Sequence, residues 1–551
     1  MSIGSRFLVA VLLCSSAAAT AQGAAEPKVE RGRAGAEDHK DKMKEQAEAG
    51  WAIPPVEEQE ARSKGRVTVS GRSLGYTATA GTLTVRDIEG KPTASMFYTA
   101  YTLDGTKPGT RRPITFFYNG GPGSPTFWLH MGSFAPVRLK TTNPEFIKPA
   151  PYDFGPNGET LLDKTDMVFL DAIGAGYSRP LGDAKPEAFY GVDEDADVFA
   201  KAILRYVTKN GRWNSPKFLF GESYGTLRSG ALAYQLQDRG MALNGVVLLS
   251  SIMNYGYRQP GLDQLYLNYL PSFAATAWYH RKLPNPPADV ATAVAQARAF
   301  AVGPYAAALA KGQTISPAEE NAIAEQMSGL IGLSPAFIKQ ANLRIDLARF
   351  QKELLRDRRQ TIGRFDSRYT GIDPDAAGER PETDASSDAI SGAFIATFHD
   401  YVTHTLGYKT EMPYRLSARD AAGWTWNWQH KAPGRGFGAQ NNPNTALDLG
   451  AAMRANPYLK VLSLNGYYDM ATPFFGTEND LGHMMLERSQ QGNLSFRYYP
   501  AGHMTYVNPE ALHQMKVDLA GWYDEAVEAA GSPVPPQAPS LSAGEPGQGP
   551  N

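Results

Sequence analysis

The sequence predicts an α/β fold built on a mostly parallel central sheet with helices on both faces. Five compact apolar runs, each followed by Gly, Asp, Asn or Ser, are separated by segments long enough to form helices, a pattern typical of buried parallel strands. With 551 residues, 42% of them hydrophobic and 11% aromatic, the chain can bury a large core. The five runs are residues 114–118, 167–170, 218–220, 246–249 and 461–464.

Charge argues against nucleic acid as a partner. Lys and Arg number 54 and Asp and Glu number 56, which gives a net charge of -2. Proteins that bind nucleic acid usually carry a clear basic excess. We therefore expect no nucleic-acid partner.

The amino terminus has the features of a signal peptide over residues 1–21. Arg6 supplies a positive charge, residues 7–19 are apolar or small, and Ala19-Thr20-Ala21 has the A-x-A form of a cleavage site. The segment is too short to span a bilayer, so we expect an exported, periplasmic or secreted protein without stable membrane insertion. Leu13 is bulky for a lipid-attachment signal at Cys14, the only cysteine, so a lipid anchor is less favoured. After cleavage no thiol nucleophile or disulfide remains.

Composition divides the rest of the chain into a core, an insertion and two polar ends. Short alternating runs at 66–101 predict antiparallel strands and hairpins. An Ala-rich block predicts helices that form a lid over the carboxyl edge of the sheet. Trp424, Trp426 and Trp428 either line a substrate pocket or pack the core of this insertion. The predicted order is a charged flexible arm at 22–65, core at 66–260, a mainly helical insertion or lid at 261–441, core at 442–530 and a disordered tail at 531–551.

A candidate nucleophile lies where a predicted strand meets a predicted helix. Gly221-Glu222-Ser223-Tyr224-Gly225 matches G-x-S-x-G, directly after the run at 218–220 and before a helix expected to reach Gln237. In α/β-hydrolases such a serine occupies a strained turn between strand and helix, and its hydroxyl projects into the active site. We predict Ser223 as the nucleophile.

A serine nucleophile needs a histidine base and a carboxylate that fixes the tautomer of the histidine. In α/β-hydrolases the acid follows the serine and the histidine comes last. Asp469 follows the run at 461–464, and His503 lies on a loop after the strand-like residues 494–499. His483 is a rival base, but its neighbours are typical of helix packing. We predict the triad Ser223, Asp469 and His503.

An oxyanion hole is the remaining requirement. The glycine-rich run at 119–124 follows the predicted strand at 114–118 and can present backbone N–H groups without side chains in the way. The second donor is expected to be the N–H of Tyr224, the residue after the nucleophile.

Together these motifs resemble the serine carboxypeptidase family over roughly residues 66–523. The resemblance implies an α/β-hydrolase with a helical insertion, no cofactor, and peptide substrates that lose single residues from their carboxyl termini. It implies Gly121 and Tyr224 as oxyanion donors, and Asn119 and Glu222 as the residues that bind the terminal carboxylate of the substrate. The matching segments are Phe117-Tyr-Asn-Gly-Gly-Pro-Gly-Ser124, Asp171-Ala-Ile-Gly-Ala-Gly-Tyr-Ser178, Gly221-Glu-Ser-Tyr-Gly225, Gly466-Tyr-Tyr-Asp469 and Gly502-His503.

A buried Glu222 that faces a substrate carboxylate must share a proton with it, so its pKa should rise and peptidase activity should favour acidic pH. The alternative is that Glu222 is a structural acid bonded to the glycine-rich loop. The chain also departs from the family pattern, because residues 130–136 contain no acid where other members carry a Glu. We expect an altered network of supporting carboxylates.

Two other functions remain open at this point. An esterase or acyltransferase would use the same nucleophile on another substrate, and a non-catalytic binding protein could share the fold. Metal binding has little support, because His399 and His404 are spaced for neither one helix face nor one strand face. We expect no metal.

Overall fold

The computed structural model describes residues 55–106, 111–421, 424–434, 438–529 and 531. The predicted signal peptide at 1–21, most of the predicted arm and the predicted tail beyond residue 531 lie outside these residues.

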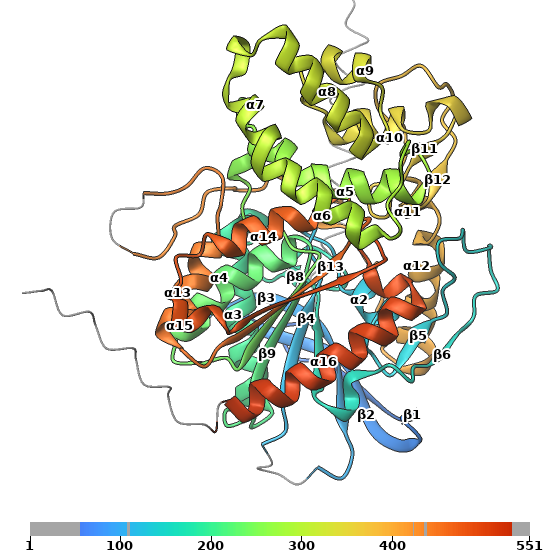
Figure 1. Cartoon of the computed structure of the whole chain (residues 1–551). Coiled ribbons are helices and arrows are strands. Elements are labelled where there is room, and N and C mark those ends of the chain that lie inside the picture. The colour runs from blue at the N-terminus through green and yellow to red at the C-terminus, as the bar shows by residue number, and fades with distance from the viewer. Residues whose placement is uncertain (1–54, 107–110, 422–423, 435–437, 530, 532–551) are drawn as a thin grey trace, which may run out of the picture. The chain divides into compact units, whose positions relative to one another are not determined.

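A mixed sheet of ten strands forms the centre of the protein (Figure 1). Its order is β1-β2-β3-β7-β4-β9-β10-β13-β14, with β8 paired to β3. The pairs from β1 to β7 are antiparallel, and those from β7 to β14 are parallel. The strands are β1 (Glu60–Val69), β2 (Arg72–Arg86), β3 (Pro92–Leu103), β4 (Ile114–Tyr118), β7 (Asp166–Leu170), β8 (Arg179–Pro180), β9 (Lys217–Glu222), β10 (Gly245–Leu249), β13 (Lys460–Gly466) and β14 (Leu494–Tyr499). Short two-stranded pairs outside this sheet are β5 (Val137–Leu139) with β6 (Phe154–Pro156) and β11 (Thr361–Ile362) with β12 (Thr370–Gly371).

The predicted strands are confirmed. All five apolar runs lie in the parallel part of the sheet, and residues 66–101 form antiparallel strands. The predicted boundary of the arm at residue 65 is wrong, because β1 begins at Glu60 and pairs there with Gly81 of β2. Charged residues alternate with partly buried ones in this stretch, so the charged side chains face solvent while the backbone forms hydrogen bonds with β2.

Helices cover both faces of the sheet, which has the α/β-hydrolase fold. Alternate strand residues face opposite sides. Phe117, Phe220 and Leu249 pack in one apolar cluster with residues of α2 (Phe127–Gly132) and α16 (Pro509–Ala529). The neighbouring strand residues pack in a second cluster with α3 (Val192–Lys209), α4 (Tyr224–Asp238) and α13 (Ala446–Ala455). Two further helices near the carboxyl end are α14 (Phe474–Gly482) and α15 (Arg488–Gln491).

A helical block with its own apolar cluster follows β10, as expected for the insertion (Figure 1). The helices end earlier than predicted, because within the described part of 406–445 the only helical element is a short turn at Ala418–Asp420. The helices of the block are α5 (Gln264–Tyr279), α6 (Val290–Phe300), α7 (Ala306–Ala310), α8 (Pro317–Ile331), α9 (Pro335–Gln340), α10 (Leu347–Glu353), α11 (Ala385–Asp388) and α12 (Ser391–Asp400). Within the described residues, none of the helices is both long enough and apolar enough to span a bilayer.

Both predicted roles for the three tryptophans are wrong. Trp424 packs against Tyr190 in a tilted arrangement, with 4.3 Å between ring centres, and Trp426 meets the ring of Tyr224 edge-on at 5.4 Å. Trp428 lies 4.7 Å from the ring of Tyr255. The tryptophans therefore pack against the α/β core.

His430 fastens this tryptophan segment to the core. Its Nδ1 lies 2.6 Å from Asp193 Oδ1 on α3, and its Nε2 lies 2.9 Å from Asp448 Oδ2 on α13. Burial favours the neutral ring, but the hydrogen bonds and charges of both carboxylates outweigh it and raise the pKa of His430 to about 9. The segment is thus held by a charged imidazole between two carboxylates.

Candidate active site

Ser223 occupies a strained turn between β9 and α4. Its backbone angles are φ 61° and ψ -130°, which non-glycine residues rarely adopt. A side chain at Gly221 would place its Cβ 2.4 Å from the carbonyl oxygen of Gly225, and one at Gly225 would reach 2.9 Å from that of Tyr118. Glycine is therefore required on both sides of Ser223, as the G-x-S-x-G motif predicted.

His503 and Asp469 are hydrogen-bonded at the carboxyl edge of the sheet. The Nδ1 of His503 lies 2.8 Å from Asp469 Oδ2. The backbone N–H groups of Ala471 and Thr472 donate to Asp469 Oδ1, and the Thr472 hydroxyl donates to Oδ2 at 2.7 Å. Burial opposes a charged ring, but the charge and hydrogen bond of Asp469 outweigh it and raise the pKa of His503. Asp469 can thus fix the imidazole with Nε2 turned to the pocket.

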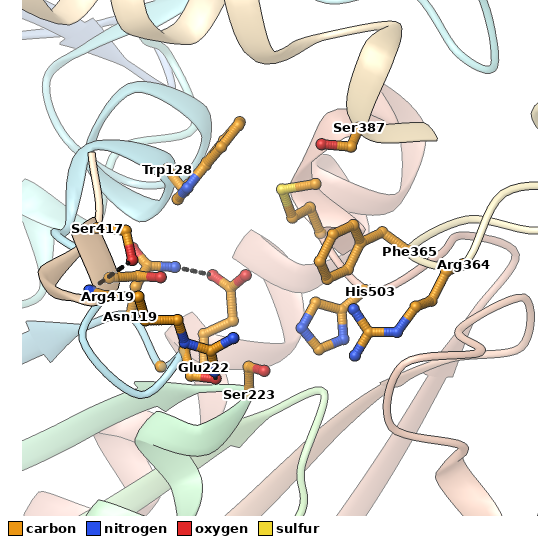
Figure 2. A pocket seen from close by; sticks show the side chains of 14 residues that line it. Asn119, Trp128, Glu222, Ser223, Arg364, Phe365, Ser387, Ser417, Arg419 and His503 are labelled. Atoms are coloured by element: carbon orange, nitrogen blue, oxygen red, sulfur yellow. Dashed lines mark hydrogen bonds between the residues drawn. The ribbon is translucent and has the colours of Figure 1, made fainter. Parts of the chain in front are cut away.

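Ser223 and His503 line one pocket, and the hydroxyl of Ser223 points toward the imidazole ring (Figure 2). No hydrogen bond joins the two side chains. Nucleophile and base commonly close this contact only when substrate binds.

The glycine-rich loop after β4 lies directly against the amino terminus of α4. A Cβ at Gly120 would be 2.4 Å from the backbone nitrogen of Tyr224. The N–H groups of Gly121 and Tyr224 both lack an acceptor among the described residues. Arg419 Nη2 donates to the carbonyl of Gly121 at 2.8 Å and holds the loop. Two free N–H groups beside a serine hydroxyl can stabilise an oxyanion.

Glu222 is buried at the base of the same pocket, with 2% of its surface exposed. Asn119 Nδ2 donates to Glu222 Oε2 at 2.9 Å, and the Tyr506 hydroxyl donates to the same oxygen at 3.0 Å. Burial raises the pKa of Glu222 to about 7, although the charge of His503 and these two hydrogen bonds act against the rise. Glu222 therefore holds a proton through much of the neutral to acidic range.

The stretch that lacks the expected acid contributes His130 instead. Its Nε2 bonds the Tyr101 hydroxyl at 2.7 Å, and burial lowers the pKa of the ring to about 3, so it is neutral. Among the described residues no second carboxylate bonds Glu222. Tyr506, which no sequence motif singled out, supplies that contact.

The pocket has a volume of about 260 Å³. Phe365 contacts His503 in two ways. Its backbone carbonyl accepts a hydrogen bond from the backbone N–H of His503 at 2.6 Å, and the centre of its ring lies 5.2 Å from that of the imidazole. Residues that the sequence pointed to and that line the pocket are Asn119, Gly120, Gly121, Ser124, Glu222, Ser223 and His503. Those that sequence reasoning missed are Trp128, Arg364, Phe365, Ser387, Ser417, Arg419 and Met504. Most of the missed residues come from the insertion, where no local motif marks them.

The other candidate histidines lie elsewhere. His483 caps α14, where its Nδ1 bonds the carbonyl of Asn479 at 2.6 Å, and it does not line the pocket. His404 pairs with Asp400 on an exposed surface. The described residues contain no group of three or more His, Cys, Asp or Glu side chains that could hold a metal ion.

Comparison with known proteins yields structural similarity only. No family model and no curated protein sequence matches the chain. A prohormone-processing carboxypeptidase from Saccharomyces cerevisiae is 12% identical, with a TM-score of 0.48, over 82% of this chain and 91% of that one. A proline iminopeptidase from Mycobacterium smegmatis is 14% identical, with a TM-score of 0.33, over 82% and 99%. An epoxide hydrolase from Aspergillus niger is 13% identical, with a TM-score of 0.33, over 82% and 79%. Similarity at this level does not identify the reaction.

Proposed function

We propose that the protein is a serine-type carboxypeptidase that hydrolyses the last peptide bond of its substrates. The observation that carries the proposal is the buried pair of Asn119 and Glu222 beside Ser223. A carboxylic acid whose pKa is raised to about 7 can donate a hydrogen bond to an anionic carboxylate, whereas an ionised one would repel it. An esterase has no need of such a group at this place.

In the proposed reaction Ser223 Oγ attacks the carbonyl carbon of the last peptide bond while its proton passes to His503 Nε2. The N–H groups of Gly121 and Tyr224 hold the negative oxygen that forms. Collapse breaks the C–N bond, the proton moves from His503 to the leaving nitrogen, and the terminal amino acid departs. Water then gives a proton to His503 Nε2 and attacks the acyl carbonyl carbon. When the bond from that carbon to Ser223 Oγ breaks, the proton passes from His503 to Ser223 Oγ and the shortened peptide is released.

A pair of amino-blocked peptides tests this function. One ends in a free carboxylate and the other in a carboxamide, and products are followed by mass spectrometry at pH 5 and pH 7. The proposal predicts loss of one residue from the free acid, much slower loss from the amide, and none with Ser223→Ala. Hydrolysis of an activated ester by Ser223 without cleavage of either peptide would instead identify an esterase or acyltransferase.

We further propose export, on the basis of residues 1–21. Sequencing of the amino terminus from an extracytoplasmic fraction should begin at Gln22. A protein that keeps Met1 and stays in the cytoplasm would contradict this proposal.

A further inference from the structure

A hairpin loop of the insertion contacts both of the loops that carry Asp469 and His503. β11 and β12 pair as antiparallel strands, and the hairpin loop between them spans residues 363–369. Two of its residues, Arg364 and Phe365, line the catalytic pocket. The insertion thus reaches the triad at a point far from it in the sequence.

Backbone hydrogen bonds join the hairpin loop to both neighbours of Asp469. The N–H of Met470 donates to the carbonyl of Arg364 at 3.1 Å, and the N–H of Ser367 donates to the carbonyl of Tyr468 at 3.1 Å. Asp469 stands between these two contacts in the chain. Its backbone position therefore depends on the hairpin loop.

The same loop lies against His503. The carbonyl of Phe365 accepts the backbone N–H of His503, and Figure 2 shows the Phe365 ring beside the imidazole. A Cβ on Gly502 would lie 2.4 Å from both the carbonyl oxygen of Phe365 and the Cβ of Asp366. Glycine at position 502 permits this close approach, which gives the Gly502-His503 pair of the sequence a packing role.

Arg368 fastens the hairpin loop to the loops on either side of it. Its Nε and Nη2 donate to the two carboxylate oxygens of Asp366 at 2.9 and 2.5 Å, and both residues are buried. Its Nη1 donates to the carbonyl of Pro500, in the loop after β14, at 2.8 Å, and its guanidinium lies 5.0 Å from the ring centre of Tyr468. Nη2 also donates to Asn143 Oδ1 at 2.6 Å. A buried ion pair adds little net stability over apolar residues, but its directional bonds fix geometry.

The insertion holds the hairpin loop from the other side through Ser367, which is buried. Its hydroxyl is hydrogen-bonded to that of Thr276 at 2.6 Å, and its carbonyl lies 2.7 Å from His280 Nε2. Thr276 lies on α5, and His280 directly follows that helix. The hairpin loop is therefore a packed bridge from α5 to the carboxyl edge of the sheet.

We propose that Arg368 is a positioning residue of the triad. It holds the hairpin loop against the loops that carry Asp469 and His503, and thereby sets the geometry of the hydrogen bond between these two side chains. Arg368 does not line the pocket and acts through this loop. The inference rests on the proposed function for the triad alone, and it holds whether the substrate is a peptide or an ester.

Hydrolysis of an uncharged aryl ester, measured as kcat/KM against pH, tests the inference. Arg368→Met breaks the clamp, whereas Gly502→Ala pushes the hairpin loop away from His503 and leaves Arg368 in place. Both should lower kcat/KM about tenfold to 100-fold, the range that a misplacement of about 1 Å can cause. Arg368→Lys keeps one cation beside Asp366 and should give an intermediate value.

The pH profile separates positioning from charge. The ester kcat/KM rises with pH as His503 loses its proton. Burial lowers the pKa of His503, and the charge and hydrogen bond of Asp469 raise it. Weakening that hydrogen bond should move the rise to lower pH, whereas loss of the Arg368 charge alone would move it to higher pH. The other charged groups that act on His503, Glu222 and Arg364, are unchanged in these variants.

Two matched variants control for lost stability. Arg344, in the same insertion, donates to both carboxylate oxygens of Asp263 at 2.7 and 2.8 Å and does not line the pocket. Gly492→Ala adds a carbon that meets nothing within 4 Å among the described residues. Arg344→Met and Gly492→Ala should keep the wild-type kcat/KM and pH profile, whatever urea unfolding shows for their stability.

Wild-type kinetics in Arg368→Met and Gly502→Ala would overturn the inference, as would equal losses of kcat/KM in Arg368→Met and Arg344→Met. A profile displaced to higher pH in Arg368→Met would reduce its role to charge and would also overturn it. If Arg368→Met does not fold, Gly502→Ala and Arg368→Lys decide by the same criteria. Ester hydrolysis by Ser223 without peptide cleavage would refute the carboxypeptidase and retain the positioning role. Absence of both ester hydrolysis and covalent labelling at Ser223 would refute the triad and this inference together.

Discussion

Replacing Glu222 by Gln removes a titrating group while keeping its shape and its hydrogen-bond partners. In the folded protein the pKa of Glu222 rises from its ordinary value of 4.5 to about 7, because the side chain is buried. The amide has no such proton to lose. The variant should therefore differ from the wild type in a way that depends on pH.

The shift fixes the size of the effect on stability. A rise of between two and three pKa units corresponds to about 3 kcal/mol, at roughly 1.36 kcal/mol per unit. Between pH 4.5 and pH 7 the unfolded chain loses the proton while the folded protein retains it, so wild-type stability falls by that amount. Above pH 7 Glu222 is ionised in both the folded and the unfolded state, and the loss of wild-type stability stays constant. Relative to wild type, Glu222→Gln should gain about 3 kcal/mol between pH 4 and pH 8.

Urea unfolding across this pH range measures the stability difference, and Asp183→Asn, at a carboxyl whose side chain is 93% exposed, serves as the control. The kinetic counterpart is kcat/KM on a free-acid peptide. In the wild type it should fall about tenfold for each pH unit above 7 as Glu222 ionises, whereas in Glu222→Gln this decline should disappear. A stability difference that does not change with pH, together with parallel pH profiles, would refute the assignment of a shared proton to Glu222.

Three further outcomes follow from the contacts described above. His430→Gln should cost about 3 kcal/mol of unfolding free energy at pH 7, because it leaves two carboxylates facing each other. The stabilisation that the charged His430 contributes is complete below pH 6.5 and is lost as pH rises through about 9. Equal losses of unfolding free energy at pH 7 and pH 10 would contradict this role. Thr472→Val should lower kcat about tenfold by removing a hydrogen bond to the triad carboxylate, with Thr472→Ser retaining activity; full activity of the valine variant would count against this contact. Gly120→Ala places a methyl group against the nitrogen of Tyr224 and should lower kcat about 100-fold. Gly155→Ala, whose added carbon meets nothing within 4 Å, should behave as wild type, and an equal loss in both would refute the oxyanion argument.

The parallel strands and the turn at Ser223 were predictable because their signals are local. Each apolar run is flanked by polar or small residues, and the two glycines around Ser223 are required by contacts within a few residues or with the adjacent strand. The order of Ser223, Asp469 and His503 follows from the order of strands, since each stands at the carboxyl end of one. Their catalytic roles stay predictions.

The rest of the pocket had no local signal. Phe365 and Arg364 reach His503 only because the insertion folds back over the sheet. Tyr506 meets Glu222 because the loop after β14 returns to the end of β9. Contacts between distant segments leave no periodicity in either segment. The alternation of Trp426 and Trp428 was equally uninformative, since it does not say which surface the rings cover.

Covalent labelling tests the central claim most directly. A fluorophosphonate, followed by intact mass and peptide mapping, should add one phosphonyl group to Ser223 and none to Ser223→Ala. A non-reacting free-acid peptide analogue should slow this labelling much more than its carboxamide, because only the free acid engages Asn119 and Glu222. Absence of label on Ser223, or equal protection by acid and amide, would contradict the account.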